Sequence, residues 1–198
     1  TPSFNQARFL EETIQSVFSQ RYPNLEYFII DGGSTDGSVD IIRRYADRLA
    51  GWISEADGGQ AHAINKGLRM ATGEWVGWQN SDDFYYPDAF ESLARAARRR
   101  PRADLIIGDM QLVNARGGPI RDIRYVKPTH GALLAEGMVL TNQAAFWRRS
   151  VHADVGFLDE NYDCGFDFDW FLRLTRARRS THVNAIWGAW RLHDDAKA

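Results

Sequence analysis

The feature that most constrains the fold is an alternation of amphipathic helical segments and short apolar runs along the first half of the chain. Leu10, Ile14, Val17 and Phe18 recur at helical spacing. The pattern predicts helices over 9–19, 39–49, 61–71 and 87–100, and strands over 27–30, 52–54 and 75–79. Such alternation favours right-handed crossovers and an α/β fold: a Rossmann-like, mostly parallel twisted sheet flanked by helices.

The second half shows a less regular pattern. It predicts strands over 105–108, 111–114 and 120–125, with a turn at Gly117 and Gly118 joining the last two, and a short helix over 168–174. Near the start of the chain, Asn5 is suited to cap the first helix.

Composition excludes several classes of protein. The 198 residues suffice for one domain, 1–198, and the formal net charge of −2 gives no support for a nucleic-acid partner. The longest apolar runs fall short of the roughly 20 residues of a membrane helix, so no membrane span is expected. The single cysteine, Cys164, excludes an internal disulfide and favours a cytoplasmic location, including the inner face of the membrane.

Acidic and small residues follow each predicted strand, where ligands bind in open parallel sheets. The loop QNSDD ends in Asp82 and Asp83, and two adjacent carboxylates suit Mg²⁺ or Mn²⁺ held together with diphosphate oxygens. A solvated acidic turn that caps the helix near Pro87 is the alternative. The histidines lack metal-ligand spacing, and His193 alone is kept as a candidate ligand.

Two glycine-bearing loops offer a second group of ligand contacts. Asp31 and Gly32 open the loop DGGSTDGS, where the carboxylate could accept hydrogen bonds from a base or ribose, and Asp57 stands in a similar loop after the next strand. The alternative is an ordinary strand-to-helix turn with Asp36 or Ser38 as the helix cap.

A third acidic group lies in the second half of the chain. Asp163, Asp167 and Asp169 flank an aromatic cluster at the start of the predicted helix. Carboxylates among aromatic rings lose part of their hydration, which suits a general base. Capping of the helix by Asp167 or Asp169 is the alternative. The tryptophans of the predicted strands, Trp52, Trp75 and Trp78, are assigned to the core.

The order of these motifs resembles that of the family 2 glycosyltransferases of the GT-A fold. The resemblance rests on TPSFNQARFLEETIQSVFSQ, YFIIDGGSTDGS, SEADGGQAHAINKGLRMATGEWVGWQNSDDFYYPDAF and GFLDENYDCGFDFDWFLRL. It implies a single GT-A domain, with 1–110 as the nucleotide-binding half and 111–198 as the acceptor-binding half. It also implies a first strand before Thr1, so the sequence is expected to be a fragment.

The resemblance further implies roles for individual residues. Those expected to border the nucleotide are Thr1, Pro2, Phe4, Asp31, Gly32, Asp57 and Asp82. Asp83 would hold the metal, with His193 as a further ligand, and Arg191 and His193 would lie near the diphosphate. Asp167 would be the catalytic base.

Two motifs depart from the family pattern. Asn80 and Ser81 precede the acidic pair where many relatives have another Asp, and Phe166 replaces the usual Glu beside Asp167.

The function implied is an inverting, metal-dependent transfer of a sugar from a nucleotide-diphosphate sugar, most simply a UDP-linked one, to a hydroxyl. The acceptor would be a carbohydrate or lipid-linked saccharide, as in the synthesis of cell-surface polysaccharide or glycoconjugates. Two alternatives stay open: a sugar nucleotidyltransferase, and an inactive glycan-binding module with the same fold.

Overall fold

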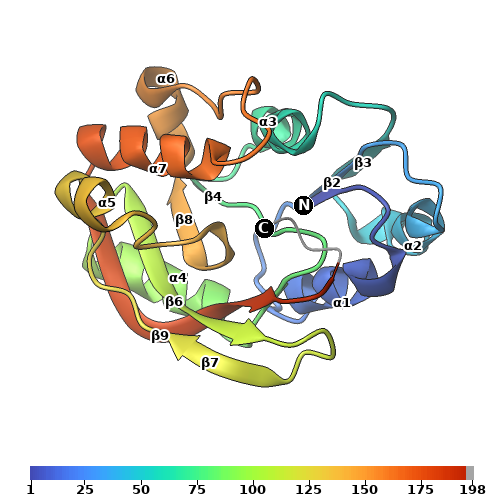
Figure 1. The fold of residues 1–198 in the computed structure, drawn as a ribbon, viewed down its shortest axis with the longest axis horizontal. Helices are drawn as coiled ribbons and strands as arrows, with labels where there is room; N and C mark the ends of the chain where they lie inside the picture. The colour runs from blue at the N-terminus through green and yellow to red at the C-terminus, as the bar shows by residue number, and fades with distance from the viewer. Residues whose placement is uncertain (195–198) are drawn as a thin grey trace.

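The computed structural model describes residues 1–194 and has an α/β architecture with helices on both sides of two sheets (Figure 1). The first sheet is parallel, in the order β1-β2-β3. Its strands are β1 (Pro2–Ser3), β2 (Phe28–Asp31) and β3 (Gly51–Ser54), and the helices after them are α1 (Ala7–Phe18), α2 (Ser38–Arg44) and α3 (Gln60–Met70). The predicted alternation is confirmed here.

The second sheet has the order β4-β8-β6-β9-β5, with β7 paired to β6. Its strands are β4 (Trp75–Val76), β5 (Phe84–Tyr85), β6 (Leu105–Val113), β7 (Pro119–Ile123), β8 (Ala145–Arg148) and β9 (Ser180–Arg191). Within residues 1–194 only β6 and β9 pair in parallel in this sheet. The expected parallel pairing thus holds in the first sheet and at the centre of the second. The β6–β7 connection is a tight turn, which only antiparallel strands allow.

The remaining helices cover the second sheet. They are α4 (Ala89–Arg99), α5 (His130–Glu136), α6 (His152–Val155) and α7 (Phe166–Ala177), with short 3₁₀ turns at Ala46–Arg48, Asn142–Ala144 and Arg149–Val151. Figure 1 shows α5, α6 and α7 together at one side of the molecule and α1 and α2 at the other.

Strand β6 divides two hydrophobic cores. Leu105 and Ile107 pack into the core beneath α7, whereas Ile106 and Met110 pack into the core formed with α1 and α4. Successive side chains of a strand point to opposite faces, so the uninterrupted apolar run 105–107 indicates a strand that is buried on both faces.

Two of the strands predicted in the second half are one strand. We expected a break after Gly108, but β6 runs through it from Leu105 to Val113. A Cβ atom at Gly108 would lie only 2.4 Å from the ring of Trp187 on β9. The glycine therefore makes room for a tryptophan across the sheet, and does not mark a turn.

Several predicted boundaries move for local reasons. The helix expected over 39–49 ends at Arg44 and continues as a 3₁₀ turn, and the helix expected from Pro87 begins at Ala89, because Asp88 has a positive φ of 64°. The strand expected over 75–79 is regular only at Trp75–Val76. Beyond that point residues 77–79 line a cavity of about 410 Å³ between the two sheets.

The expected cap of α1 is wrong. Asn5 has a positive φ of 51° and its side chain accepts a bond from the Thr35 amide. The free amides at the start of α1 are bound instead by the loop after β2. Asp36 Oδ2 accepts from Ala7 N at 2.8 Å, and Ser38 Oγ accepts from Gln6 N at 3.1 Å.

Candidate active site

The acidic pair lies where the loop after β4 meets the end of β9. Asp83 is 1 % exposed and accepts three hydrogen bonds: from Gln143 Nε2 at 2.7 Å, the Arg191 amide at 2.8 Å and Asn80 Nδ2 at 3.1 Å. Burial, together with the neighbouring charge of Asp82, raises the pKa of Asp83 to about 7. The carboxylate of Asp83 therefore points into the protein interior and is bound by protein groups.

Asp82 is more accessible than Asp83. Its side chain is 18 % exposed, and its Oδ2 lies 3.0 Å from Nε2 of His193. The other ring nitrogen of His193, Nδ1, is buried and has no partner among the described residues. This geometry brings His193 next to the acidic pair, and its expected contact with a metal or a diphosphate stays a prediction.

Arg191 binds the backbone of the loop that carries the acidic pair. Its guanidinium, 2 % exposed, donates to the backbone oxygens of Asp82 and Ala115 and to the carboxylate of Glu12. These bonds hold the loop in place. The expected contact of Arg191 with a diphosphate stays a prediction.

The loop after β2 is organised around Asp31. This carboxylate is fully buried and accepts from Gly33 N, Ser34 N and Ser54 Oγ at 2.8–3.1 Å, and from Ser34 Oγ at 2.5 Å. Aspartate oxygens at a strand end commonly bind loop amides in this way. The expected contact of Asp31 with a base stays a prediction.

Apart from Asp82, the other residues expected at the nucleotide lie around the same loop. Asp57 lies against Gly32, since a Cβ atom there would be 3.1 Å from Asp57 Oδ2. Thr1 and Pro2 belong to the parallel sheet beside β2, and the adjacent Phe4 is 61 % exposed. The two glycine-bearing loops thus converge as the strand order predicts.

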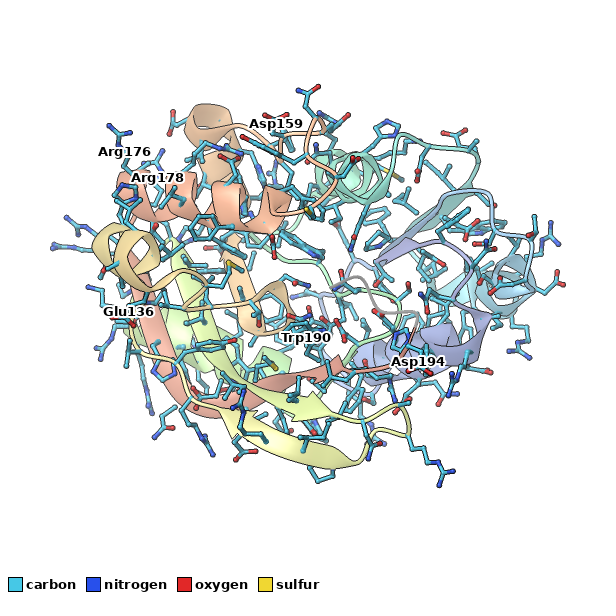
Figure 2. The ribbon with its side chains drawn as sticks, in the orientation of Figure 1. Glu136, Asp159, Arg176, Arg178, Trp190 and Asp194 are labelled. Carbon is cyan, nitrogen blue, oxygen red and sulfur yellow. The ribbon has the colours of Figure 1, made fainter. Side chains whose placement is uncertain are left out.

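A second cavity, of about 290 Å³, opens beside the acidic pair. Asp167 at the start of α7 lines it together with Asn80, which binds Asp83. Trp78 and Trp190 add aromatic surface, and Figure 2 shows Trp190 towards the middle of the molecule, with Arg176 and Arg178 at the far end of α7. Residues from both halves of the chain thus meet in one cavity.

Asp167 and Asp169 have different surroundings although both lie in the first turn of α7. Asp169 forms an ion pair with Arg173, whose guanidinium also donates to the carbonyls of Val155 and Phe157. Asp167 accepts one bond, from Phe168 N to Oδ1, and its Oδ2 has no hydrogen-bond partner within residues 1–194. Asp169 is therefore structural, and Asp167 has an oxygen available to a ligand.

Sequence reasoning missed two residues of this site. Asn142 and Gln143 precede β8, are 5 % and 4 % exposed, and line the cavity of Asp167. An Asn-Gln pair directly before the apolar run 144–147 was the available signal, because buried amides require partners.

The donor set of the acidic pair fits a divalent cation. A carboxylate oxygen and an imidazole nitrogen are ligands that Mn²⁺ accepts, and Mg²⁺ or Mn²⁺ commonly adds substrate phosphates to one or two carboxylates. Within residues 1–194 no group of three or more His, Cys, Asp or Glu side chains is placed to hold a metal unaided. A cation here would therefore need oxygen atoms from a ligand.

Comparison with solved structures defines the class of fold. TarS of S. aureus, crystallised with UDP-GlcNAc, has a TM-score of 0.81 at 20 % identity over 98 % of this chain and 58 % of that protein. The mannosyltransferase PcManGT of Pyrobaculum calidifontis, in complex with GDP-Man and Mn²⁺, has a TM-score of 0.70 at 22 % identity over 98 % of this chain and 56 % of its own. The fold is that of the GT-A glycosyltransferases.

Sequence comparison then defines the family. Residues 1–155 match Glycosyl transferase family 2, and the chain belongs to that family. A chondroitin synthase of Pasteurella multocida is 28 % identical over 196 residues, which is 98 % of this chain and 20 % of that protein. The chain thus spans about a fifth of the length of several curated relatives that it matches. Among the described residues no helix is long and apolar enough to cross a membrane.

Proposed function

We propose that this chain transfers a sugar from a UDP-linked donor to a hydroxyl of a carbohydrate or lipid-linked saccharide, with inversion at the anomeric carbon. The observation that carries the proposal is a shared cavity: Asp167, whose Oδ2 has no hydrogen-bond partner among the described residues, lines it together with Asn80 and Gln143, which both donate to Asp83. A structural neighbour that binds UDP-GlcNAc and a relative that makes a polysaccharide support this reading.

In the proposed reaction Asp167 takes the proton of the acceptor hydroxyl. The acceptor oxygen forms a bond to the anomeric carbon while the bond from that carbon to the diphosphate breaks, and its electron pair leaves with the diphosphate. A single displacement inverts the configuration and needs no covalent intermediate. The products are the new glycoside and the nucleoside diphosphate.

The nucleotide would lie across the two loops that follow β2 and β3. The exposed ring of Phe4 offers an aromatic face to the base, and its neighbour Asn5 is joined to the loop through Ser34. Asp31, Gly32 and Asp57 would add the polar contacts, with Thr1 and Pro2 beneath them. Residues 1–110 would thus form the nucleotide-binding half, and residues 111–198 the acceptor-binding half.

A divalent cation would be held at the acidic pair. Asp82 presents an accessible carboxylate, the buried His193 beside it would be the second ligand, and Asp83 keeps the loop of the acidic pair in place. The chemistry such a cation supplies is to offset the negative charge that develops on the departing diphosphate. A structural neighbour that binds Mn²⁺ supports this assignment. The cytoplasmic location inferred from the single cysteine belongs to the same proposal.

Turnover with nucleotide sugars tests the proposal directly. We expect the protein to release UDP, and not pyrophosphate, when it is supplied with UDP-sugars, Mn²⁺ and a mixture of saccharide acceptors. Asp167→Asn should lower the rate roughly 100-fold or more and leave UDP binding nearly intact, since the change removes the basic oxygen and preserves the shape.

Asp169→Asn is the matched control. It removes the charge that pairs with Arg173, so it should lower the melting temperature and have much less effect on turnover. An inactive Asp169→Asn beside an active Asp167→Asn would place the base two residues further along α7. Pyrophosphate as the product would indicate a nucleotidyltransferase, and saturable sugar binding without nucleotide binding would indicate a binding module.

A further inference from the structure

Two buried polar atoms in the wall of the Asp167 cavity have no hydrogen-bond partner among the described residues. They are Nδ2 of Asn142 and Oε1 of Gln143, on consecutive residues that are each at least nine-tenths buried. Most buried side-chain polar atoms in folded proteins are paired, because an unpaired one forfeits its hydration without compensation. Two adjacent exceptions that both line a cavity indicate a ligand that completes their bonds.

The orientation of Gln143 follows from its other partner. Its Nε2 donates to Asp83 Oδ2 at 2.7 Å, while Asn80 and the Arg191 amide donate to the same carboxylate. The amide nitrogen therefore faces Asp83 and the carbonyl oxygen is left unpaired. The wall thus offers one donor, from Asn142, and one acceptor, from Gln143.

A sugar ring carries hydroxyl groups that can pair with both of these atoms. Each hydroxyl can both donate and accept, so two hydroxyls of one ring can satisfy a donor and an acceptor placed side by side. Aromatic surface in the same cavity, from Trp78 and Trp190, suits the apolar face of a pyranose.

The hydrogen bond between Gln143 and Asp83 indicates that this sugar belongs to the donor and not to the acceptor. In a nucleotide-diphosphate sugar the transferred ring is bonded to the terminal phosphate, and the proposed function places the diphosphate beside Asp82 and Asp83. The wall next to Asp83 therefore meets the donor sugar first.

We propose that Asn142 Nδ2 and Gln143 Oε1 bind two hydroxyls of the transferred sugar and thereby select it. This inference rests on the proposed function and adds the residues that recognise the donor's sugar. Neither residue takes part in bond making: both are specificity-determining residues. A site that hydrogen-bonds a hydroxyl discriminates strongly against an analogue that lacks it, because the protein groups are then left unpaired.

The test compares the binding of UDP with that of UDP-sugars by calorimetry in the presence of Mn²⁺. The wild-type protein is first titrated with UDP, GDP, UDP-glucose, UDP-galactose, UDP-N-acetylglucosamine and GDP-mannose, and the tightest nucleotide sugar is used thereafter. Asn142→Asp, which keeps the shape and replaces the donor by an acceptor, should weaken that nucleotide sugar about tenfold and leave the free nucleoside diphosphate within twofold.

Asn24→Asp is the matched control, since Asn24 is exposed and does not line this cavity. It should leave both affinities unchanged. Asn142→Ser gives a second variant without the amide in case the aspartate does not fold, as judged by thermal unfolding. Deoxy analogues of the sugar test the wild-type protein itself: removal of one of the two recognised hydroxyls should weaken binding by a similar factor, and the loss should vanish in the Asn142 variant.

The outcomes separate the two proposals. Equal weakening of the nucleotide and the nucleotide sugar, or no weakening of either, would overturn the role of the amide pair and leave the proposed function standing. A wild-type protein that binds none of these nucleotides would overturn both.

Discussion

The aspartates of the site differ in how much of each carboxylate is already bound by protein. Asp31 and Asp83 are buried and accept several bonds from neighbouring groups, Asp169 is paired with Arg173, and Asp82 and Asp167 keep oxygens for a ligand. All of these residues are aspartates, so their roles are distinguished by their hydrogen-bond and ion-pair partners and not by residue type.

This difference leads to a prediction about the metal. We expect Mn²⁺ to tighten UDP binding at least tenfold over the level in a chelator, and Asp82→Asn or His193→Ala to remove most of that gain. Calorimetry with and without Mn²⁺ measures it. Asp83→Asn should chiefly lower thermal stability, because an amide cannot accept all three bonds.

Two results would contradict this assignment. If only Asp83→Asn removes the metal dependence, the cation sits on Asp83, as the family resemblance implies. Equal affinity in chelator and in Mn²⁺ would exclude a metal role for the acidic pair.

His152 is a half-buried titratable group outside the site. Its ring is stacked between Phe157 and Trp170, accepts a bond from Trp147 Nε1 at 3.0 Å, and lies 2.7 Å from the Gly156 oxygen. Burial, aided by nearby arginines, lowers the pKa of His152 below its ordinary value of 6.5. The folded state thus holds the neutral ring.

Protonation should therefore destabilise the fold. Because the folded pKa is below the unfolded one, this contribution is complete above pH 6.5 and is lost as the pH falls below it. Urea unfolding at pH 7.5 and at pH 5.5 should show a smaller loss of stability in His152→Gln than in the wild type. The variant itself should be about 1–2 kcal/mol less stable at pH 7.5, because the stacking is lost.

His62→Gln is the control, since His62 contacts an exposed loop through Gly58 N. It should retain the wild-type pH dependence. An unchanged pH dependence in His152→Gln would show that the acid sensitivity arises elsewhere.

At the scale of elements, one carboxylate binds backbone amides at the N-termini of two helices. Asp36 binds the Ala7 amide of α1 with Oδ2, and the Ser38 amide and hydroxyl of α2 with Oδ1. Burial opposes the charge, but these hydrogen bonds together lower the pKa of Asp36 below its ordinary value. The loop proposed to bind the nucleotide therefore also holds the first helix in position.

Asp36→Ala should lower the free energy of unfolding by about 1–2 kcal/mol, since it removes the caps of two helices. Chemical denaturation measures the loss. Asp40→Ala, in the first turn of α2, removes an exposed ion pair with Arg43 and should change the free energy of unfolding by less than about 0.5 kcal/mol. Equal effects of the two substitutions would refute the shared cap.

The same elements show what sequence periodicity can predict. The helices and strands of the first half follow from local spacing, because each βα unit buries its own apolar face. Asn5 was the wrong cap because the true partners, Asp36 and Ser38, lie about thirty residues away along the chain. Strand β9, which joins β6 to β5, was not anticipated, because its polar residues break the pattern.

At the scale of the molecule, the site depends on how closely β9 approaches the 3₁₀ turn Asn142–Ala144. A Cβ atom at Gly188 of β9 would lie 1.9 Å from the backbone oxygen of Gln143. Only glycine permits this crossing, which brings the amide wall next to Asp83. Sequence alone shows the glycine but not what it meets, which is also why Asn142 and Gln143 were missed.

Gly188→Ala should destabilise the protein by more than about 3 kcal/mol, because backbone atoms on both sides must move. Gly131→Ala is the control: its Cβ would meet nothing within 4 Å, and alanine favours the helix by about 0.5–1 kcal/mol. Thermal unfolding of the two variants should therefore move in opposite directions. A stable Gly188→Ala protein would mean that β9 does not pass so close to Gln143.

The bonds from β9 to the acidic pair also impose an order in time. Asp82 and His193 are 111 residues apart in the chain, and Asp83 and Arg191 are 108. During translation both aspartates leave the ribosome well before the residues that hold them. A nascent chain therefore carries the loop of Asp82 and Asp83 without its partners until β9 has been made and has paired with β6, so this part of the candidate site is completed only after more than a hundred further residues have been added.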